Sequence, residues 1–204
     1  LPIDPATGKE KIIDIDGAYG RAVGHSIFDF YVREYAGVNP ETGVSEWNVY
    51  WVDSNADGVR QTAENIPSLA DFQAKTPEQM AQVKVSRTAT YAEATTKFVD
   101  KSPFPTVRGA FSLNGGLGNF DISAQFLYSL GGYAYDGAYA GLMNSGGAAG
   151  GNNYHTDILA RWTAKGQGTD VPRLSAGQDA NVSSTSTRFI TKSDFLALNN
   201  VQIG

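Results

Sequence analysis

Apolar and polar residues alternate along two arms of the chain, within the stretch from residue 105 to residue 135. The first arm places on one face Val107, Gly109, Phe111 and Leu113. The second arm places on one face Phe120, Ile122, Ala124, Phe126, Tyr128 and Leu130. A period of two residues is that of a β-strand with one apolar and one polar face. Since residues 115–119 (GGLGN) supply the positive φ angles that a tight turn needs, the pattern predicts a long β-hairpin.

Shorter alternating segments, several of them rich in aromatic residues, lie on both sides of this hairpin. They cover residues 9–16, 26–35, 46–52 and 195–204. The turn residues of Asn39–Gly43 (NPETG), with proline near the start and glycine at the end, predict a tight connection between two of these segments. Together with the two arms of the hairpin, the pattern predicts about six strands.

The connections between the predicted strands differ greatly in length. Those at 39–43 and 115–119 are short, whereas those at 53–105 and 137–193 are long and show little alternation. Loops of that length are uncommon in compact domains unless they are functional. Short turns on one side and long loops on the other are typical of outer-membrane barrels.

The long connections contain a few local signals. Thr76–Val83 combines a threonine at the N-cap position with proline and glutamine in the first turn, which predicts a short helix. A second short helix is expected from Thr156 to Trp162. The glycine- and asparagine-rich run at 143–153 (MNSGGAAGGNN) is expected to be irregular.

Two environments fit strands of this kind. In a membrane barrel the apolar face meets lipid and the polar face lines the lumen, and each strand needs about 9–11 residues. In a soluble sandwich the apolar face packs against a second sheet, and turn signals recur about every 8–12 residues. The second arm has the length of a transmembrane strand, and Tyr133, Tyr135 and Tyr139 follow it. Long connections alternating with short turns are typical of outer-membrane barrels, so they favour the barrel over the sandwich.

Composition excludes several classes of function. The net charge of −5 and the pI near 5.0 argue against nucleic acid as a partner, because no basic run is present to bind phosphates. No stretch approaches 18 apolar residues, so no transmembrane helix is expected. The absence of cysteine removes disulfides, thiolate metal sites and a cysteine nucleophile. Because His25 and His155 lack the spacing of a catalytic triad, we expect no enzyme activity.

One loop matches a calcium-binding motif. Residues 53–64 satisfy the pattern D-x-[DN]-x-[DN]-G-x5-E in full. The candidate calcium ligands are Asp53, Asn55, Asp57, the carbonyl of Val59, and Glu64. The loop follows a predicted strand rather than a helix, so the alternative is a turn formed by aspartate, asparagine and glycine without any metal ion.

Aromatic and charged residues near the predicted strands suggest positions relative to a membrane. Trp47, Trp51 and the tyrosines between 128 and 139 are expected in the interfacial girdle of a barrel, with sugar stacking as the alternative. Arg108 and Asp121 are expected to line the lumen.

Several stretches resemble one family of membrane proteins. Residues 23–43 (VGHSIFDFYVREYAGVNPETG) closely resemble the stretch VGHSIYDFYLREYAGVDPETG of SusC-like TonB-dependent transporters of Bacteroidota. Residues 101–123 are similar to the family's hairpin, in which KS-x-x-P precedes GFDLS. Residues 157–174 are similar to its loop with D-x-x-x-RW and PRL, and residues 193–204 resemble its strand YLRLKNITLGY. The matches follow the family's order and span most of the chain.

The resemblance implies an all-β fold, namely a segment of an antiparallel transmembrane β-barrel with long extracellular loops that carry short helices. Residues 1–204 would form part of one barrel domain, from the C-terminal part of the barrel. The plug domain, the TonB box and most of the roughly 22 strands of such a barrel would lie outside this chain. Two features depart from the family: Ala197 stands where a basic residue is usual, and residues 145–151 do not align.

The resemblance also implies a function. It implies active import of a large nutrient, an oligosaccharide or an oligopeptide, through the outer membrane of a Gram-negative bacterium. A SusD-like surface lipoprotein would cover the barrel, TonB would supply energy through the absent plug region, and lipid and the remaining strands would surround this segment. The alternative is a secreted β-sandwich that binds carbohydrate and carries a calcium-stabilised loop. The sandwich would bury Phe111, Phe126 and Tyr128 against a second sheet.

Overall fold

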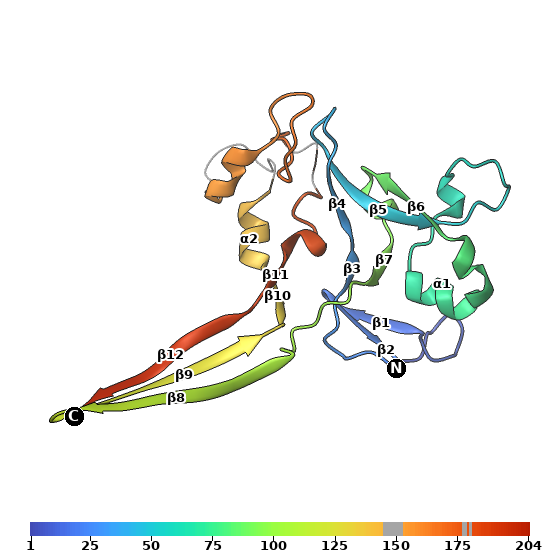
Figure 1. The fold of residues 1–204 in the computed structure, drawn as a ribbon. Helices are drawn as coiled ribbons and strands as arrows, with labels where there is room; N and C mark the ends of the chain where they lie inside the picture. Colours follow the sequence, from blue (N-terminus) through green and yellow to red (C-terminus); the bar gives the residue numbers. More distant parts are fainter. Residues whose placement is uncertain (145–152, 177–178, 180) are drawn as a thin grey trace. The chain divides into compact units, whose positions relative to one another are not determined.

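The computed structural model describes residues 1–144, 153–176, 179 and 181–204, and it shows an all-β chain of antiparallel sheets with a few short helices (Figure 1). The fold class predicted from the sequence is therefore confirmed. The strands are β1 Ile13–Asp16, β2 Tyr19–Ala22, β3 Tyr31–Arg33, β4 Tyr35–Val38, β5 Ser45–Trp51, β6 Lys84–Thr88, β7 Thr96–Phe98, β8 Val107–Leu117, β9 Phe120–Leu130, β10 Tyr133–Tyr135, β11 Ile190–Lys192 and β12 Phe195–Ile203. The α-helices are α1 Leu69–Lys75 and α2 Gly137–Leu142, and the 3₁₀ helices are η1 Thr62–Glu64, η2 Pro77–Gln82, η3 Tyr91–Glu93, η4 Thr156–Ala160 and η5 Thr187–Phe189.

The chain divides into two compact units. The first unit comprises Leu1–Asp100 and Asp136–Phe189, and the second comprises Lys101–Tyr135 and Ile190–Gly204. The first contains the three-stranded sheet β4-β5-β6 and the pairs β1-β2 and β3-β7. The second contains the three-stranded sheet β12-β9-β8 and the pair β10-β11.

Strand β5 organises the core of the first unit. Its burial alternates strictly, with Ser45, Trp47, Val49 and Trp51 buried and the residues between them half-buried. Trp47 and Trp51 are only 3% and 4% exposed. Their assignment to an interfacial girdle, or to a sugar-stacking surface, is therefore wrong. The physical reason is that other parts of the first unit cover this face of β5, and the ring of Trp47, for example, packs edge-on against that of Tyr91.

The long stretch from 53 to 102 is more structured than its lack of alternation suggests. It contains α1, β6 and β7, which the sequence pattern did not predict. The predicted helix at 76–83 is present as η2, and the one at 156–162 as η4, both of them 3₁₀ helices. The described residues hold twelve strands instead of about six, because short strands of three to five residues carry too few side chains to show a period. Residues 145–152 of the glycine-rich run lie outside the described residues.

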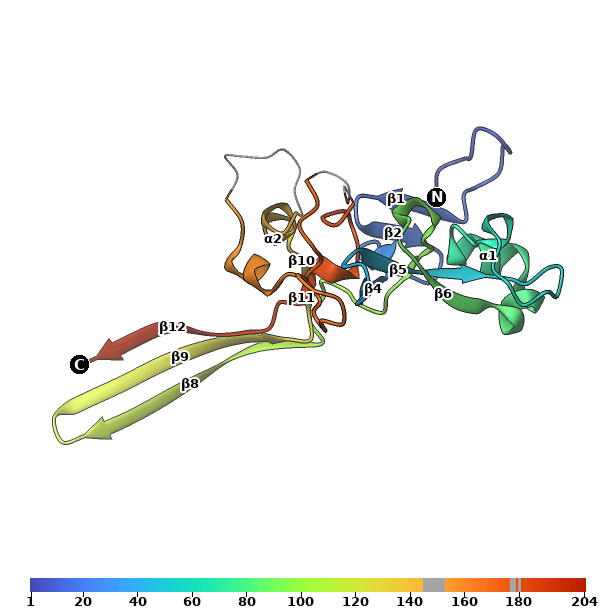
Figure 2. The same ribbon diagram turned by 90° about the horizontal axis from the view of Figure 1, so that it is seen from above.

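The second unit contains the predicted long hairpin. Strands β8 and β9 pair along their whole length from Val107 opposite Leu130 to Leu117 opposite Phe120, and β12 lies on the other side of β9 (Figure 2). The turn is shorter than predicted, since β8 continues through Gly115 and Gly116 and only Gly118 and Asn119 connect the strands. Gly118 has a φ of 64°, which suits a two-residue hairpin turn.

A bulge in β12 keeps its apolar side chains on the same face of the sheet as the apolar side chains of β9. Leu198 pairs with Phe126, and the next pair is Asn200 with Gln125, so Asn199 is an additional residue. Its side-chain Nδ2 donates to Gln125 Oε1 over 2.9 Å. Without the bulge, the alternation that places Leu196 and Leu198 on one face would place Val201 and Ile203 on the other. With it, all four lie on the face of Phe126 and Tyr128.

The three-stranded sheet of the second unit has one apolar face and one mainly polar face. In the described chain, no residue of β8, β9 or β12 is buried. Phe111 is 43% exposed and stacks on Phe126 in the neighbouring strand, with 5.0 Å between ring centroids. The opposite face carries serine, asparagine and glutamine side chains together with Arg108 and Asp121, as their alternation predicts. Among the described residues, none of the helices is long and apolar enough to cross a membrane.

Candidate functional site

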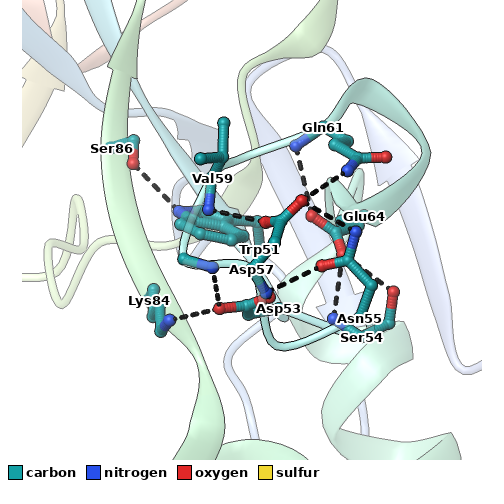
Figure 3. Close-up of polar contacts among 11 residues, drawn as sticks. Trp51, Asp53, Ser54, Asn55, Asp57, Val59, Gln61, Glu64, Lys84 and Ser86 are labelled. Atoms are coloured by element: carbon teal, nitrogen blue, oxygen red, sulfur yellow. Dashed lines mark hydrogen bonds and ion pairs between the residues drawn. The ribbon is translucent and has the colours of Figure 1, made fainter.

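Hydrogen bonds join three of the predicted calcium ligands, Asp53, Asn55 and Asp57, at the start of the loop, whereas Glu64 bonds to Ser54 and Gln61 (Figure 3). Asp53 Oδ1 accepts from the backbone N–H of Asp57 and Asp53 Oδ2 from that of Gly58, over 3.1 and 2.9 Å. Asn55 Oδ1 also accepts from the Asp57 N–H over 3.1 Å. The glycine at the sixth position has a φ of 75°, as the sharp turn of the motif requires.

Glu64, at the twelfth position, closes the loop. Its Oε1 accepts from the backbone N–H and the hydroxyl of Ser54, over 2.9 and 2.8 Å, and its Oε2 accepts from the Gln61 N–H over 3.1 Å. These hydrogen bonds, the one from the Ser54 hydroxyl first, hold the pKa of Glu64 below its usual value. Val59 contributes its N–H, which donates to Asp57 Oδ1 over 2.8 Å.

A lysine outside the loop supplies a positive charge to it. Lys84 Nζ, from β6, lies 2.7 Å from Asp53 Oδ2 and 5.0 Å from the centre of the Trp51 ring. The hydrogen bond from Lys84 is the main reason why the pKa of Asp53 is below its usual value. The sequence did not point to Lys84, because it lies 31 residues from Asp53 and reaches the loop only through the pairing of β5 with β6.

The loop thus satisfies its oxygens internally. The carboxylates of Asp53, Asp57 and Glu64 each accept hydrogen bonds from the chain itself, and the Lys84 ammonium pairs with Asp53. Within the described residues, no group of three or more histidine, cysteine, aspartate or glutamate side chains is arranged to hold a metal ion. Calcium binding at Asp53, Asn55, Asp57, Val59 and Glu64 stays a prediction.

The two histidines lie in different surroundings. His25 stacks on Phe98 with 3.6 Å between ring centroids, and its Nδ1 is 3.5 Å from Asp29 Oδ2. His155 Nδ1 accepts from the backbone N–H of Asp157 over 3.2 Å at the start of η4. Each histidine therefore has a local structural role in the described contacts.

Two of the stretches that resemble the transporter family, residues 23–43 and 157–174, meet in the first unit. The Asn39–Gly43 turn packs against Trp162, whose Nε1 donates to the carbonyl oxygen of Pro40 over 3.0 Å. The backbone N–H of Arg173 donates to the Gly43 carbonyl over 2.9 Å, and its Nη1 donates to that of Thr42 over 3.2 Å. Segments some 120 to 130 residues apart in the sequence are thereby joined.

The comparisons with known proteins point to one group of structures. No family model matches the sequence, and no curated protein matches it. A structure of the RagAB peptide transporter aligns with a TM-score of 0.64 at 24% identity, over 97% of this chain and 18% of that chain. Two structures of the RagAB peptide importer, in its closed-closed and open-open states, align with a TM-score of 0.61 at 24% identity, over 91% of this chain and 17% and 16% of theirs.

These comparisons show that the fold is shared. The chain spans less than a fifth of the length of each of these neighbours. The likeness covers both compact units, since 97% of the chain is aligned in the first comparison.

Proposed function

We propose that this chain is a segment of the wall and outer loops of a TonB-dependent outer-membrane transporter of the SusC-like kind. The transporter imports a large nutrient, either an oligopeptide or an oligosaccharide. The feature that carries this proposal is the sheet β12-β9-β8, which presents a continuous apolar face that no other part of the described chain buries. A continuous apolar face over three strands would favour aggregation if it were exposed to water, whereas contact with lipid would stabilise it.

The lengths and edges of these strands support the same proposal. Strands β8 and β9 have 11 residues each and β12 has 9, which is the length that crosses a bilayer when the strands are tilted. The outer strands β8 and β12 leave the two edges of the sheet to pair with further strands of the same barrel. The polar face, with Arg108 and Asp121, would then line the lumen.

The alternative, a secreted β-sandwich, is not favoured. It requires a second sheet over Phe111, Phe126 and Tyr128. Phe111 is 43% exposed, and the other two are half-buried among their neighbours on the same sheet.

The similar structures support a peptide as the ligand, since they are of a peptide transporter. On this proposal, a SusD-like surface lipoprotein covers the barrel, and TonB supplies energy through a plug region outside this chain. On the same proposal, the transporter lies in the outer membrane of a Gram-negative bacterium that belongs to the Bacteroidota. The first unit, which has its own core around β5, would form the extracellular part that meets the lipoprotein and the ligand.

Cell fractionation with mass determination tests this proposal. We expect the intact polypeptide to need detergent for extraction from the outer-membrane fraction and to have a denatured mass several times 21.8 kDa. Uptake of a labelled oligopeptide library by cells that contain it should stop when TonB is deleted. An oligosaccharide library measured in parallel decides between the two classes of nutrient.

The opposite result has a clear meaning. A polypeptide of 21.8 kDa that is soluble without detergent would exclude the barrel and support the secreted sandwich. Membrane localisation with uptake that persists without TonB would leave the barrel but remove TonB as the energy source.

A further inference from the structure

The first unit contains a hollow of about 410 Å³ that we call the Arg188 hollow. Its walls come from the edge strand β4, the start of α2, residues 170–171 and η5. The side chains that matter for the argument are Tyr35, Tyr139, Asp170, Thr187 and Arg188.

Arg188 is a half-buried cation without an ion-pair partner among the described carboxylates. Its guanidinium carbon lies 5.4 Å from the centre of the Tyr35 ring and 5.0 Å from that of the Phe189 ring. Nη1 donates to the carbonyl oxygen of Val182 over 2.7 Å. A guanidinium has five N–H donors, so one such bond leaves most of its donors to bind a further acceptor. Burial lowers the pKa of Arg188, but an arginine keeps its charge at neutral pH.

The other polar groups of the Arg188 hollow are already engaged, with one exception. The Tyr35 hydroxyl donates to the backbone carbonyl of Asp170 over 3.0 Å, and the Tyr139 hydroxyl donates to Asp157 Oδ2 over 2.8 Å. The Thr187 hydroxyl accepts from the Tyr35 N–H over 2.9 Å. The carboxylate of Asp170 is the exception, and it is the negative charge among the lining residues that competes for Arg188.

A second hollow of about 410 Å³ continues from the first along β4. The two share Ala36, Gly37 and Asp170, and the second extends to Pro40 and Gln167. An extended chain whose end lies at Arg188 therefore has room along the edge strand of the sheet β4-β5-β6.

We propose that the Arg188 hollow binds a carboxylate group of the imported ligand, with the guanidinium as its partner and the rings of Tyr35 and Phe189 holding the guanidinium in place. The fork of an arginine matches the two oxygens of a carboxylate, and a half-buried cation gains most from a partner that neutralises it. The inference rests on the proposed transport function. Two sources present this chemistry, namely the C-terminus of a peptide and the carboxylate of an acidic sugar.

Binding to the intact polypeptide in detergent, measured by calorimetry, tests the proposal. The probes are N-acetyl-Ala-Phe with a free carboxylate, the same dipeptide as its carboxamide, and digalacturonic acid. We expect the free dipeptide to bind at least about tenfold more tightly than its carboxamide, which is the scale of a charge-assisted hydrogen bond. Tighter binding of digalacturonic acid than of the dipeptide would identify an acidic sugar as the source of the carboxylate.

Three variants make the test specific. Arg188→Gln should abolish the preference for the carboxylate, whereas Asp170→Asn should strengthen binding several-fold because it removes the competing charge. Arg87→Gln removes an exposed arginine that pairs with Glu46 outside the hollow, and it should leave binding unchanged. If Arg188→Gln does not fold, the test rests on Asp170→Asn, which keeps Arg188 in place and should bind the carboxylate probe more tightly than the wild type does.

Equal binding of carboxylate and carboxamide by the folded wild type, or no binding of any probe, overturns the proposal. So does an Asp170→Asn variant with weaker binding. These outcomes leave the transport function standing if uptake still depends on TonB. Conversely, carboxylate binding by a protein that supports no uptake would overturn only the transport function.

Discussion

Gly43 shows how one residue position depends on a side chain far away in the sequence. Its φ is 74°, and a Cβ added there would lie 2.4 Å from Cε3 of Trp162, which is closer than atoms can approach. The indole of Trp162 thus lies directly on the backbone of the Asn39–Gly43 turn, and this close approach requires glycine.

Gly43→Ala should lower the free energy of unfolding by more than about 1 kcal/mol, because it adds both a strained φ and a clash with Trp162. The measurement is thermal unfolding of the intact polypeptide in detergent. Gly166→Ala is the matched control, since Gly166 has a φ of 84° but no atom within 4 Å of an added Cβ. Equal losses in the two variants would mean that Trp162 contributes nothing beyond the backbone strain.

The Asp53–Glu64 loop allows a direct test of calcium binding. A calcium ion at Asp53 would have to displace Lys84, so we expect calcium to raise the unfolding temperature of Lys84→Met more than that of the wild type. Glu64→Gln, which weakens the ligand at the twelfth position, should remove the effect. If calcium leaves the unfolding temperatures of the wild type, Lys84→Met and Glu64→Gln unchanged, the loop is a hydrogen-bonded turn without a metal ion.

Glu34 predicts a dependence of stability on pH. Burial raises the pKa of this carboxyl, but hydrogen bonds from Asn48 and Tyr50 and the charge of Lys97 outweigh burial, so the pKa is below its usual value. The stabilisation is therefore present above the pKa of the unfolded chain, about 4.3, and is lost as the pH falls through the lower pKa of the folded state.

We expect Glu34→Gln to lower the unfolding temperature at pH 7, and the difference from the wild type to shrink as the pH falls through the lowered pKa of Glu34 in the folded state. Unfolding scans of both proteins between pH 7 and pH 3 measure this. A difference that is constant across the whole range would show that the charge of Glu34 contributes nothing.

At the scale of elements, the bulge at Asn199 determines which side chains of β12 join the apolar face. Deleting Asn199 should be tolerated, because the strand then alternates without interruption and Val201 and Ile203 stay on that face. The cost should be that of one hydrogen bond to Gln125, about 1 kcal/mol.

Deleting Ala197 is the matched control for this prediction. It shifts Leu198 to the polar face and should strongly reduce the fraction of folded protein in the membrane. The fraction folded can be measured by protease resistance. Equal yields from the two deletions would contradict the pairing of β12 with β9.

At the scale of the whole molecule, the two faces of the sheet β12-β9-β8 should respond differently to charge. If the apolar face meets lipid, Phe111→Arg should cost about 2–4 kcal/mol near the middle of the bilayer. Ser112→Arg, one residue along and on the opposite face, should cost much less, because on the proposed arrangement that face would meet water in the lumen. Denaturant unfolding from lipid vesicles measures both, and equal costs would argue against a lipid-facing surface.

Local patterns predicted the parts of the candidate site that lie close together in the chain. The ligands of the Asp53–Glu64 loop lie within twelve residues, so their spacing was visible. Lys84 and Arg188 were missed, because each acquires its role from neighbours that only the fold provides. The two tryptophans of β5 were misplaced for a related reason: alternation shows that they share a face but not what covers that face.

The sequence by itself determined the hairpin β8-β9, the period of its faces and the all-β class, because side-chain alternation along a strand is a local property. Tertiary structure decided the rest. It decided that the face of Trp47 and Trp51 is buried while the face of Phe111 is open, that a bulge returns Val201 to the apolar face, and that Trp162 lies on Gly43. Each of these depends on pairing between residues far apart in the chain, and the period of a single strand carries no information about its partner.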